Sequence, residues 1–475
     1  MTPLHPCLFT VFALSLPKGL GFGSTPPVSA WISSNELTIG VLTLDSISRK
    51  YGVLIMRRRE DDVWAVLRRD TDSFSEEDML EIIRIYCTEH AHRVPLPSGV
   101  RRRPPLWDVK GREQSGIFKM LGQDFNSRGA WMLNQLYLAM PNPDPNWARD
   151  CQTENFHTRL WEAQLLGSFR EQGLLVTQDF PSPDFHVMNK LGGEAWVEAV
   201  TVNPTVRYDH ATAGKPSFPE ERRERVLGTA MERFARTLRN KLSKNYPAMP
   251  NVIGKPFAIA IADFHAPGSM MWSREALISY LYGFYVKELK NEGKTIAVAE
   301  PLDNLLCDHK IPGGLFCSAE NKSLSAIIFS NAATIAKLSR VPMSFGGKSE
   351  EYRYVRIGEF ADDSPGALRG IPFCLDVSSD EYRTLWKPYN YEPWTAEIEV
   401  FHNPNAQHPI DPALFPEATH WLPTESGIVC KRFFSHQILK SRTLVQATSR
   451  PLPNVDCLDF RDTFDADATM EKGNN

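Results

Sequence analysis

The chain contains 475 residues, of which 42% are hydrophobic and 23% are charged, and its formal net charge is −4. A chain of this length exceeds one ordinary hydrophobic core, so we expect a globular protein with two or three domains. The slightly acidic balance excludes a protein that coats nucleic acid through overall positive charge, and any phosphate binding must come from a local basic patch.

The apolar runs and the cysteines indicate where in the cell the protein is expected to lie. No apolar run reaches the roughly 20 residues that cross a bilayer, so we expect no membrane partner. The eight cysteines include no Cys-x-x-Cys pair, which favours reduced thiols in a cytoplasmic protein. Cys307, His309 and Cys317 could supply three zinc ligands, but we favour a loop that happens to hold these residues.

The first 30 residues are expected to form an irregular segment. The apolar stretch CLFTVFALSL, residues 7–16, has no basic segment before it, so it does not match a secretory signal peptide. The stretch GLGFGST, residues 19–25, lacks the Gly-Lys-Ser/Thr ending of a phosphate-binding loop.

Residues 31–145 are predicted to form a small α/β module and a linker. Residues 36–45 and 51–69 have strand patterns, and residues 75–90 have the serine cap and early acids of a helix. Residues 93–108 hold four prolines together with Arg101, Arg102 and Arg103. We favour a solvated linker there, with phosphate contact by the arginines as the alternative.

The clearest pattern lies in residues 146–345, where helices and strands are predicted in the order αβββαβαβ. This order predicts an α/β fold with a mixed sheet flanked by helices. The predicted segments are a helix at 157–173, strands at 174–180, 184–189 and 194–202, a long basic helix at 219–247, a strand at 256–264, a helix at 273–289 and a strand at 324–331.

Residues 346–475 differ in character from the preceding region. Strand patterns at 397–410 and 427–435 lie in proline-rich surroundings, and residues 455–475 read as a polar tail. We therefore expect a β-rich C-terminal module. The two terminal modules are candidate surfaces for a protein partner.

Two carboxylates are unusual in the predicted hairpin of residues 181–200. Asp184 begins one strand, and Glu198 lies in an apolar run of the next. Side chains alternate along a strand, so Glu198 shares a face with Trp196 and Val200, although both faces of this strand are apolar. A carboxylate in such a strand is costly unless it is protonated, paired with a cation or bound to a metal ion.

Glu162 is a third candidate acid, because it lies on the apolar side of the predicted helix 157–173. Three inward acids match the oxygen ligands that a hard divalent cation prefers. A structural interpretation stays open, in which Asp184 caps a turn and Glu198 pairs with a buried arginine from the basic helix.

These residues resemble the PD-(D/E)XK nuclease superfamily, which has a restriction-endonuclease-like fold. The matching residues are Pro183-Asp184 and Glu198-Ala199-Val200, with Glu162 at the helix acid of many members, over residues 150–345 at most. The resemblance implies an αβββαβ core and the hydrolysis of phosphodiester bonds in DNA. It also implies a Mg²⁺ or Mn²⁺ ion held by Asp184 and Glu198, with Glu162 bound directly or through water.

One position departs from the superfamily pattern. The last motif residue is usually a lysine that helps to orient the attacking water, and here it is Val200. Either the lysine has moved to the following helix as Lys241 or Lys244, or the domain has lost catalysis and only binds nucleic acid or protein. The structural interpretation of both lysines is a solvated side chain near a helix C-terminus.

Further candidates lie on nearby elements. Arg233, Arg236 and Arg239 on the basic helix are candidates for contact with a phosphate backbone, although solvated basic faces are common. We interpret His186 as a hydrogen-bonded histidine rather than a metal ligand or base. Gln178 is a candidate for the water shell of the metal.

The whole chain is also similar to a group of bacterial proteins that carry the label "glycosaminoglycan attachment site". That label depends on Ser-Gly pairs, which here are Ser98-Gly99, Ser115-Gly116 and Ser426-Gly427. None continues as Ser-Gly-x-Gly, so we assign no attachment site.

Overall fold

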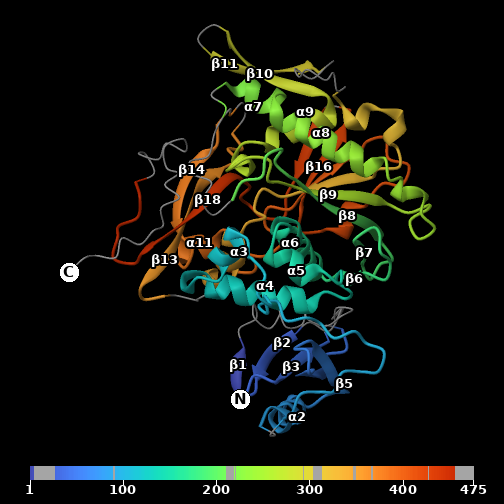
Figure 1. Cartoon of the computed structure of the whole chain (residues 1–475), viewed down its shortest axis with the longest axis vertical. Coiled ribbons are helices and arrows are strands. Elements are labelled where there is room, and N and C mark those ends of the chain that lie inside the picture. The colour runs from blue at the N-terminus through green and yellow to red at the C-terminus, as the bar shows by residue number, and fades with distance from the viewer. Residues whose placement is uncertain are drawn as a thin grey trace.

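The computed structural model describes most of the chain, and Figure 1 shows its course. In these residues the protein is a mixed α/β structure with an eight-stranded mixed sheet, a five-stranded sheet, a three-stranded sheet and a β-hairpin. The described residues are 1–4, 27–45, 47–88, 91–209, 219, 221–291, 294–302, 313–345, 349–364, 367, 369–425 and 427–454.

The N-terminal sheet is antiparallel throughout, in the order β1-β2-β3-β4-β5, and lies at the lower end of Figure 1. The helix α2 covers one face, where Ile83 packs in a cluster with Val53 and Ile55. Trp131 packs against the apolar cluster of the other face. The elements are β1 (Thr2–Leu4), β2 (Pro27–Ile32), β3 (Thr38–Leu44), β4 (Tyr51–Arg58), β5 (Trp64–Ser73) and α2 (Glu76–Thr88).

The prediction for residues 1–30 is wrong at both ends of that segment. Thr2–Leu4 pairs with β2, and β2 itself begins at Pro27. Three residues show too little alternation to reveal a strand, and only the distant partner β2 makes it one. The stretches CLFTVFALSL and GLGFGST lie outside the described residues.

The central sheet has the strand order β17-β16-β15-β12-β9-β8-β7-β6. Strands β8, β9 and β12 are parallel, whereas β6, β7 and β8 form antiparallel pairs. Its members are β6 (Leu175–Thr177), β7 (Phe185–Met188), β8 (Glu194–Val202), β9 (Phe257–Asp263), β12 (Ala326–Phe329), β15 (Glu399–His402), β16 (Thr419–Thr424) and β17 (Gly427–Lys431).

Helices cover both faces of this sheet, and side-chain alternation divides its core in two. On one face, Val197, Ala260 and Ile328 pack with helices that include α4 and α6. On the other, Val200 and Ile259 pack with α7, α8 and α9. These helices are α3 (Gly116–Leu121), α4 (Ser127–Ala139), α5 (Trp147–Gln152), α6 (Phe156–Glu171), α7 (Arg222–Leu227), α8 (Thr229–Leu242) and α9 (Arg274–Tyr282).

The predicted element order is found in residues 146–345, with two corrections. The predicted helix 273–289 ends early, because Gly283 adopts a φ of 74° and the chain continues as strand β10 (Phe284–Asn291), paired with β11 (Lys294–Pro301). The long basic helix is broken at Gly228, whose ψ of −140° separates α7 from α8.

The C-terminal region is β-rich, as predicted, but it does not form one separate sheet. Strands β13 (Tyr352–Phe360), β14 (Ile371–Asp376) and β18 (Ile438–Ala447) form the three-stranded sheet. Strands β15 to β17 instead extend the central sheet. The expected domain boundary at residue 346 therefore does not coincide with a boundary between sheets. The expected polar tail, residues 455–475, lies outside the described residues.

Shorter helices complete the described chain. They are α10 (Ile335–Ser344), α11 (Asp380–Thr384) and the 3₁₀ helices η1 (Asp124–Asn126), η2 (Tyr246–Ala248), η3 (Ser269–Met271), η4 (Leu315–Cys317), η5 (Ala319–Asn321) and η6 (Pro412–Leu414).

The arginine run in the linker is only partly solvated. Arg103 donates to the carbonyl oxygens of Tyr137 at 2.9 Å, Leu138 at 2.7 Å and Met140 at 2.8 Å, at the end of α4. The carbonyls at the C-terminal end of a helix lack the N–H donors of a following turn, so Arg103 caps this end of α4. For Arg103, a structural role replaces the solvated interpretation.

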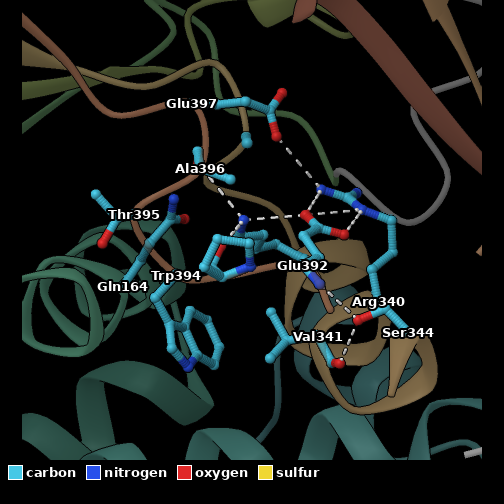
Figure 2. A network of polar contacts seen from close by, with 12 residues as sticks. Gln164, Arg340, Val341, Ser344, Glu392, Trp394, Thr395, Ala396 and Glu397 are labelled. Carbon is cyan, nitrogen blue, oxygen red and sulfur yellow. Dashed lines mark hydrogen bonds and ion pairs between the residues drawn. The ribbon is translucent and has the colours of Figure 1, made fainter. Parts of the chain in front are cut away.

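A buried ionic network joins α10, β13 and residues 392–397, and Figure 2 shows part of it. Glu392 is fully buried and lies 2.9 Å from Lys337 and 2.9 Å from Arg340, with Arg356 at 3.6 Å. Arg356 also contacts Glu397 at 2.6 Å. Burial alone would raise the pKa of Glu392, but the three cations hold it well below its usual range.

We expect Glu392→Gln to lower the free energy of unfolding by about 3 kcal/mol, because it leaves buried cations without their counter-charge. Urea unfolding measures this change, and Glu425→Gln at an exposed site is the control. Because the folded-state pKa is depressed, the contribution of Glu392 is present above the unfolded pKa of about 4.3 and is lost as the pH falls through the folded pKa. A wild type that loses no more stability on acidification than Glu392→Gln would contradict this account.

Candidate active site

Glu198 lies in the middle of β8, on the sheet face covered by α8. It shares this face with Trp196, Val200 and Val202, whereas Val197 and Ala199 face α6. The alternation predicted for this strand is therefore confirmed. The Glu198 side chain is deeply buried, with a residue exposure of 4%, so its charge has little access to water.

The two carboxylate oxygens of Glu198 have different surroundings. Oε1 accepts hydrogen bonds from Lys241 Nζ at 2.6 Å and from the Tyr246 hydroxyl at 2.6 Å. Oε2 is buried and has no hydrogen-bond partner among the described residues. Buried polar atoms are nearly always partnered, so this oxygen is a candidate ligand atom.

Asp184 lies directly before β7, next to the same part of β8. Its Oδ2 accepts a hydrogen bond from the backbone N–H of Ala199 at 2.7 Å. Burial raises the pKa of Asp184 well above its usual range, and the charges of Glu198 and Glu162 raise it further. Lys241 opposes this rise. The three predicted acids and Lys241 thus share one electrostatic environment.

Glu162 lies on α6 and already has its own partners. Its Oε1 and Oε2 lie 2.9 Å and 3.1 Å from Arg159 Nη1, and Trp147 donates to Oε2 at 2.8 Å. Burial raises the pKa of Glu162, while Arg159 opposes the rise. Arg159 also pairs with Asp150 at 2.6 Å. Glu162 therefore influences the site through its field while its oxygens are engaged elsewhere.

Asp184 and Glu198 are the two residues here that could hold a metal ion. Within the part of the chain that the structure describes, no group of three or more His, Cys, Asp and Glu side chains is arranged to hold a metal ion. Two carboxylates nevertheless suit Mg²⁺, which keeps several water ligands and binds proteins through one or two acids. The unpartnered Oε2 of Glu198 fits this role, whereas both oxygens of Glu162 already have partners on Arg159 and Trp147.

The structure distinguishes between the two candidate lysines. Val200 is buried in the apolar cluster under α8 and supplies no charge. Lys241 reaches Glu198 from the last turn of α8, whereas Lys244 lies beyond the end of the helix and is exposed. The alternative interpretation paired Glu198 with a buried arginine from the basic helix, and the partner on that helix is Lys241 instead.

His186 and Gln178 have structural contacts. His186 Nε2 lies 2.7 Å from Glu194, which also pairs with Lys255 at 2.8 Å, so the interpretation of His186 as a hydrogen-bonded histidine is confirmed. Gln178 accepts a hydrogen bond from the backbone of Asn142 at 3.2 Å. This hydrogen bond links the segment that contains Asn142 to the segment that contains Gln178.

The arginines of α8 differ in exposure. Arg236 is exposed and pairs with Glu232, and Arg239 is exposed and hydrogen-bonds Tyr280. Arg233 is half-buried. Of the considered zinc ligands, Cys307 and His309 lie outside the described residues, whereas Cys317 is an exposed free thiol.

Tyr246 is a site residue that the sequence analysis did not identify. It lies in the short helix η2, and its hydroxyl contacts Glu198 from 48 positions along the chain. Burial and Glu198 together raise its pKa, so it stays a hydrogen-bond donor at neutral pH. No sequence pattern marks such a contact, because it depends on how α8 ends.

A comparison with protein-family models finds no matching model, and comparisons with curated proteins and with solved structures find no significant similarity. No helix in the described ranges has the length and apolar character needed to span a membrane.

We expect Asp184→Asn to raise the stability of the metal-free protein at pH 8 by on the order of 1 kcal/mol. The folded-state pKa of Asp184 is raised, so ionisation weakens folding as the pH rises above the unfolded value of about 3.9. Added Mn²⁺ should raise the melting temperature of the wild type and not that of the variant.

Calorimetric melting curves measure both effects, with exposed Asp179→Asn as the matched control. The interpretation fails if Asp184→Asn and the control respond alike to pH and to Mn²⁺.

Proposed function

We propose that this protein is a metal-dependent, nuclease-like hydrolase that cleaves phosphodiester bonds in DNA. The proposal takes residues 146–345 as a restriction-endonuclease-like core, in line with the order α6, β6, β7, β8, α7, α8, β9. One observation carries it: Lys241 donates to one oxygen of Glu198, while the other oxygen is buried and has no partner among the described residues. Asp184 lies directly before the neighbouring strand β7, and its pKa responds to the charge of Glu198.

Asp184 and the Oε2 atom of Glu198 would hold a Mg²⁺ or Mn²⁺ ion. Such an ion, when bound, polarises a phosphate oxygen and lowers the pKa of a water molecule. Glu162 would keep its contacts with Arg159 and Trp147 and contribute negative charge at a distance.

The residues of this chain then orient the carboxylates and balance charge. The Ala199 N–H fixes Asp184, and the Tyr246 hydroxyl fixes Glu198. Lys241 would supply the positive charge that Val200 cannot, since its ammonium lies beside the carboxylates and can stabilise negative charge on the phosphate in the transition state.

The same helix supplies candidate contacts with the DNA backbone. Arg236 and Arg239 are exposed on α8, and the last turn of the same helix carries Lys241. Together with Arg233 they would place phosphates along the helix, which provides the local basic patch that an acidic protein needs. Free cysteines such as Cys87 and Cys151 fit a cytoplasmic location.

A second candidate function is a binding module that has lost catalysis. The pairing of Glu162 with Arg159 favours it, because a neutralised third acid is typical of a structural role. In that case the Lys241–Glu198 pair stabilises the core, and the protein binds nucleic acid or a protein partner.

A cleavage assay on supercoiled and single-stranded DNA with Mg²⁺ or Mn²⁺ separates the two functions. We expect Asp184→Asn, Glu198→Gln and Lys241→Met each to lower the cleavage rate by about 100-fold or more. Lys244→Met is the matched control, since this exposed lysine lies three positions further on, and it should cleave like the wild type.

Equal cleavage by the wild type and by Asp184→Asn would indicate a contaminating nuclease and refute the proposal. Wild type that binds DNA but never cuts it would support the binding module instead.

A further inference from the structure

An aromatic cluster lies beside the two carboxylates on the same sheet face. His186 and Trp196 are register partners on β7 and β8, and their rings stack with centroids 4.3 Å apart and an interplanar angle of 4°. Asp184 precedes His186 by two positions, and Glu198 follows Trp196 by two. Since side chains alternate along a strand, His186, Trp196 and Glu198 belong to one face, and Asp184 lies just before β7 beside it.

Phe180 extends this cluster to the surface. Its ring meets Trp196 edge-on, with centroids 5.6 Å apart and an interplanar angle of 70°. Phe180 is 50% exposed, whereas Trp196 is only 4% exposed, so the half-exposed Phe180 ring packs on the buried Trp196 ring. The loop that carries Phe180 is held in place, because Asn251 donates to the Ser182 carbonyl at 3.2 Å.

A polar atom in the cluster also lacks a partner. Trp196 Nε1 is buried and has no hydrogen-bond acceptor among the described residues. An indole N–H can only donate, so it suits an acceptor on a ligand. Trp196 and Glu198, two positions apart on β8, therefore each leave one buried polar atom unsatisfied.

The charges around the cluster indicate which part of a nucleotide it accepts. Glu194 and Lys255, which lie beside His186 and Trp196, are paired with each other at 2.8 Å. Asp184 is acidic, so a phosphate placed against the rings would meet no net positive charge from these residues. A nucleobase is uncharged, has a flat π-face and carries acceptors at its edge. It can stack on Phe180 while the phosphate lies toward Lys241 and α8.

We propose that Phe180, supported by Trp196 and His186, forms a base-stacking subsite, and that the site therefore takes single-stranded DNA or DNA with an unpaired base. This inference rests on the proposed function only in placing nucleic acid at Asp184 and Glu198. Bases in a duplex stack on one another and offer no free face, so duplex DNA cannot use the subsite.

Fluorescence anisotropy with labelled oligonucleotides of about 12 nucleotides tests the subsite on the full chain in EDTA, where binding is measured without cleavage. We expect Phe180→Ala to weaken single-strand binding by about tenfold and to leave duplex binding unchanged. Phe180→Trp should keep single-strand affinity. Phe74→Ala, which removes a phenyl ring that is 76% exposed in the loop after β5, is the matched control.

The inference is overturned if single strands do not bind, if Phe180→Ala leaves their affinity unchanged, or if it weakens duplex binding equally. The two proposals fail separately. Selective loss of single-strand binding in a protein that never cuts DNA would sustain the subsite and refute the hydrolase. Metal-dependent DNA cleavage, together with single-strand binding that Phe180→Ala does not change, would support the hydrolase and refute the subsite.

Discussion

The buried carboxylate of Glu198 is the constraint around which the site is organised. It lies in a central strand with 4% exposure, where an ionised group needs compensation. Lys241 and Tyr246 both donate to one oxygen, and the described chain offers no donor to the other. This asymmetry is the observation on which the proposal of a metal ion at the site depends.

The surroundings shift the pKa values of two acids, Glu392 and Asp184, in opposite directions. Glu392 is surrounded by Lys337, Arg340 and Arg356, and its pKa falls well below the usual range. Asp184 lies near two other acids and one lysine, and its pKa rises well above it. The first arrangement favours folding at neutral pH, whereas the second opposes it. An acid that weakens the fold in this way is typical of a functional site.

Local patterns in the sequence predicted many of the helices and strands that surround the site. The alternation around Glu198, the order of elements in residues 146–345 and the helix 75–90 follow from hydrophobic periodicity and caps, and the structure contains them. Contacts between distant segments could not be predicted.

Nothing in the spacing of Lys241 and Lys244 shows which of the two side chains contacts Glu198 on β8, because that depends on where α8 ends. Likewise Arg159 lies one turn from Glu162, but the Trp147 contact that completes its pairing comes from another helix. The joining of β15 to the central sheet is a long-range pairing of the same kind.

The most direct test of the account is a crystal structure of the protein grown with Mn²⁺, with anomalous diffraction data that locate the ion. We predict an anomalous peak within about 2.5 Å of both Asp184 and Glu198 Oε2, with water completing the coordination and Glu162 still bound to Arg159. A map with no peak there, in which Glu198 Oε2 instead accepts a hydrogen bond from a protein group, would contradict the claim that this carboxylate is buried to hold a metal ion.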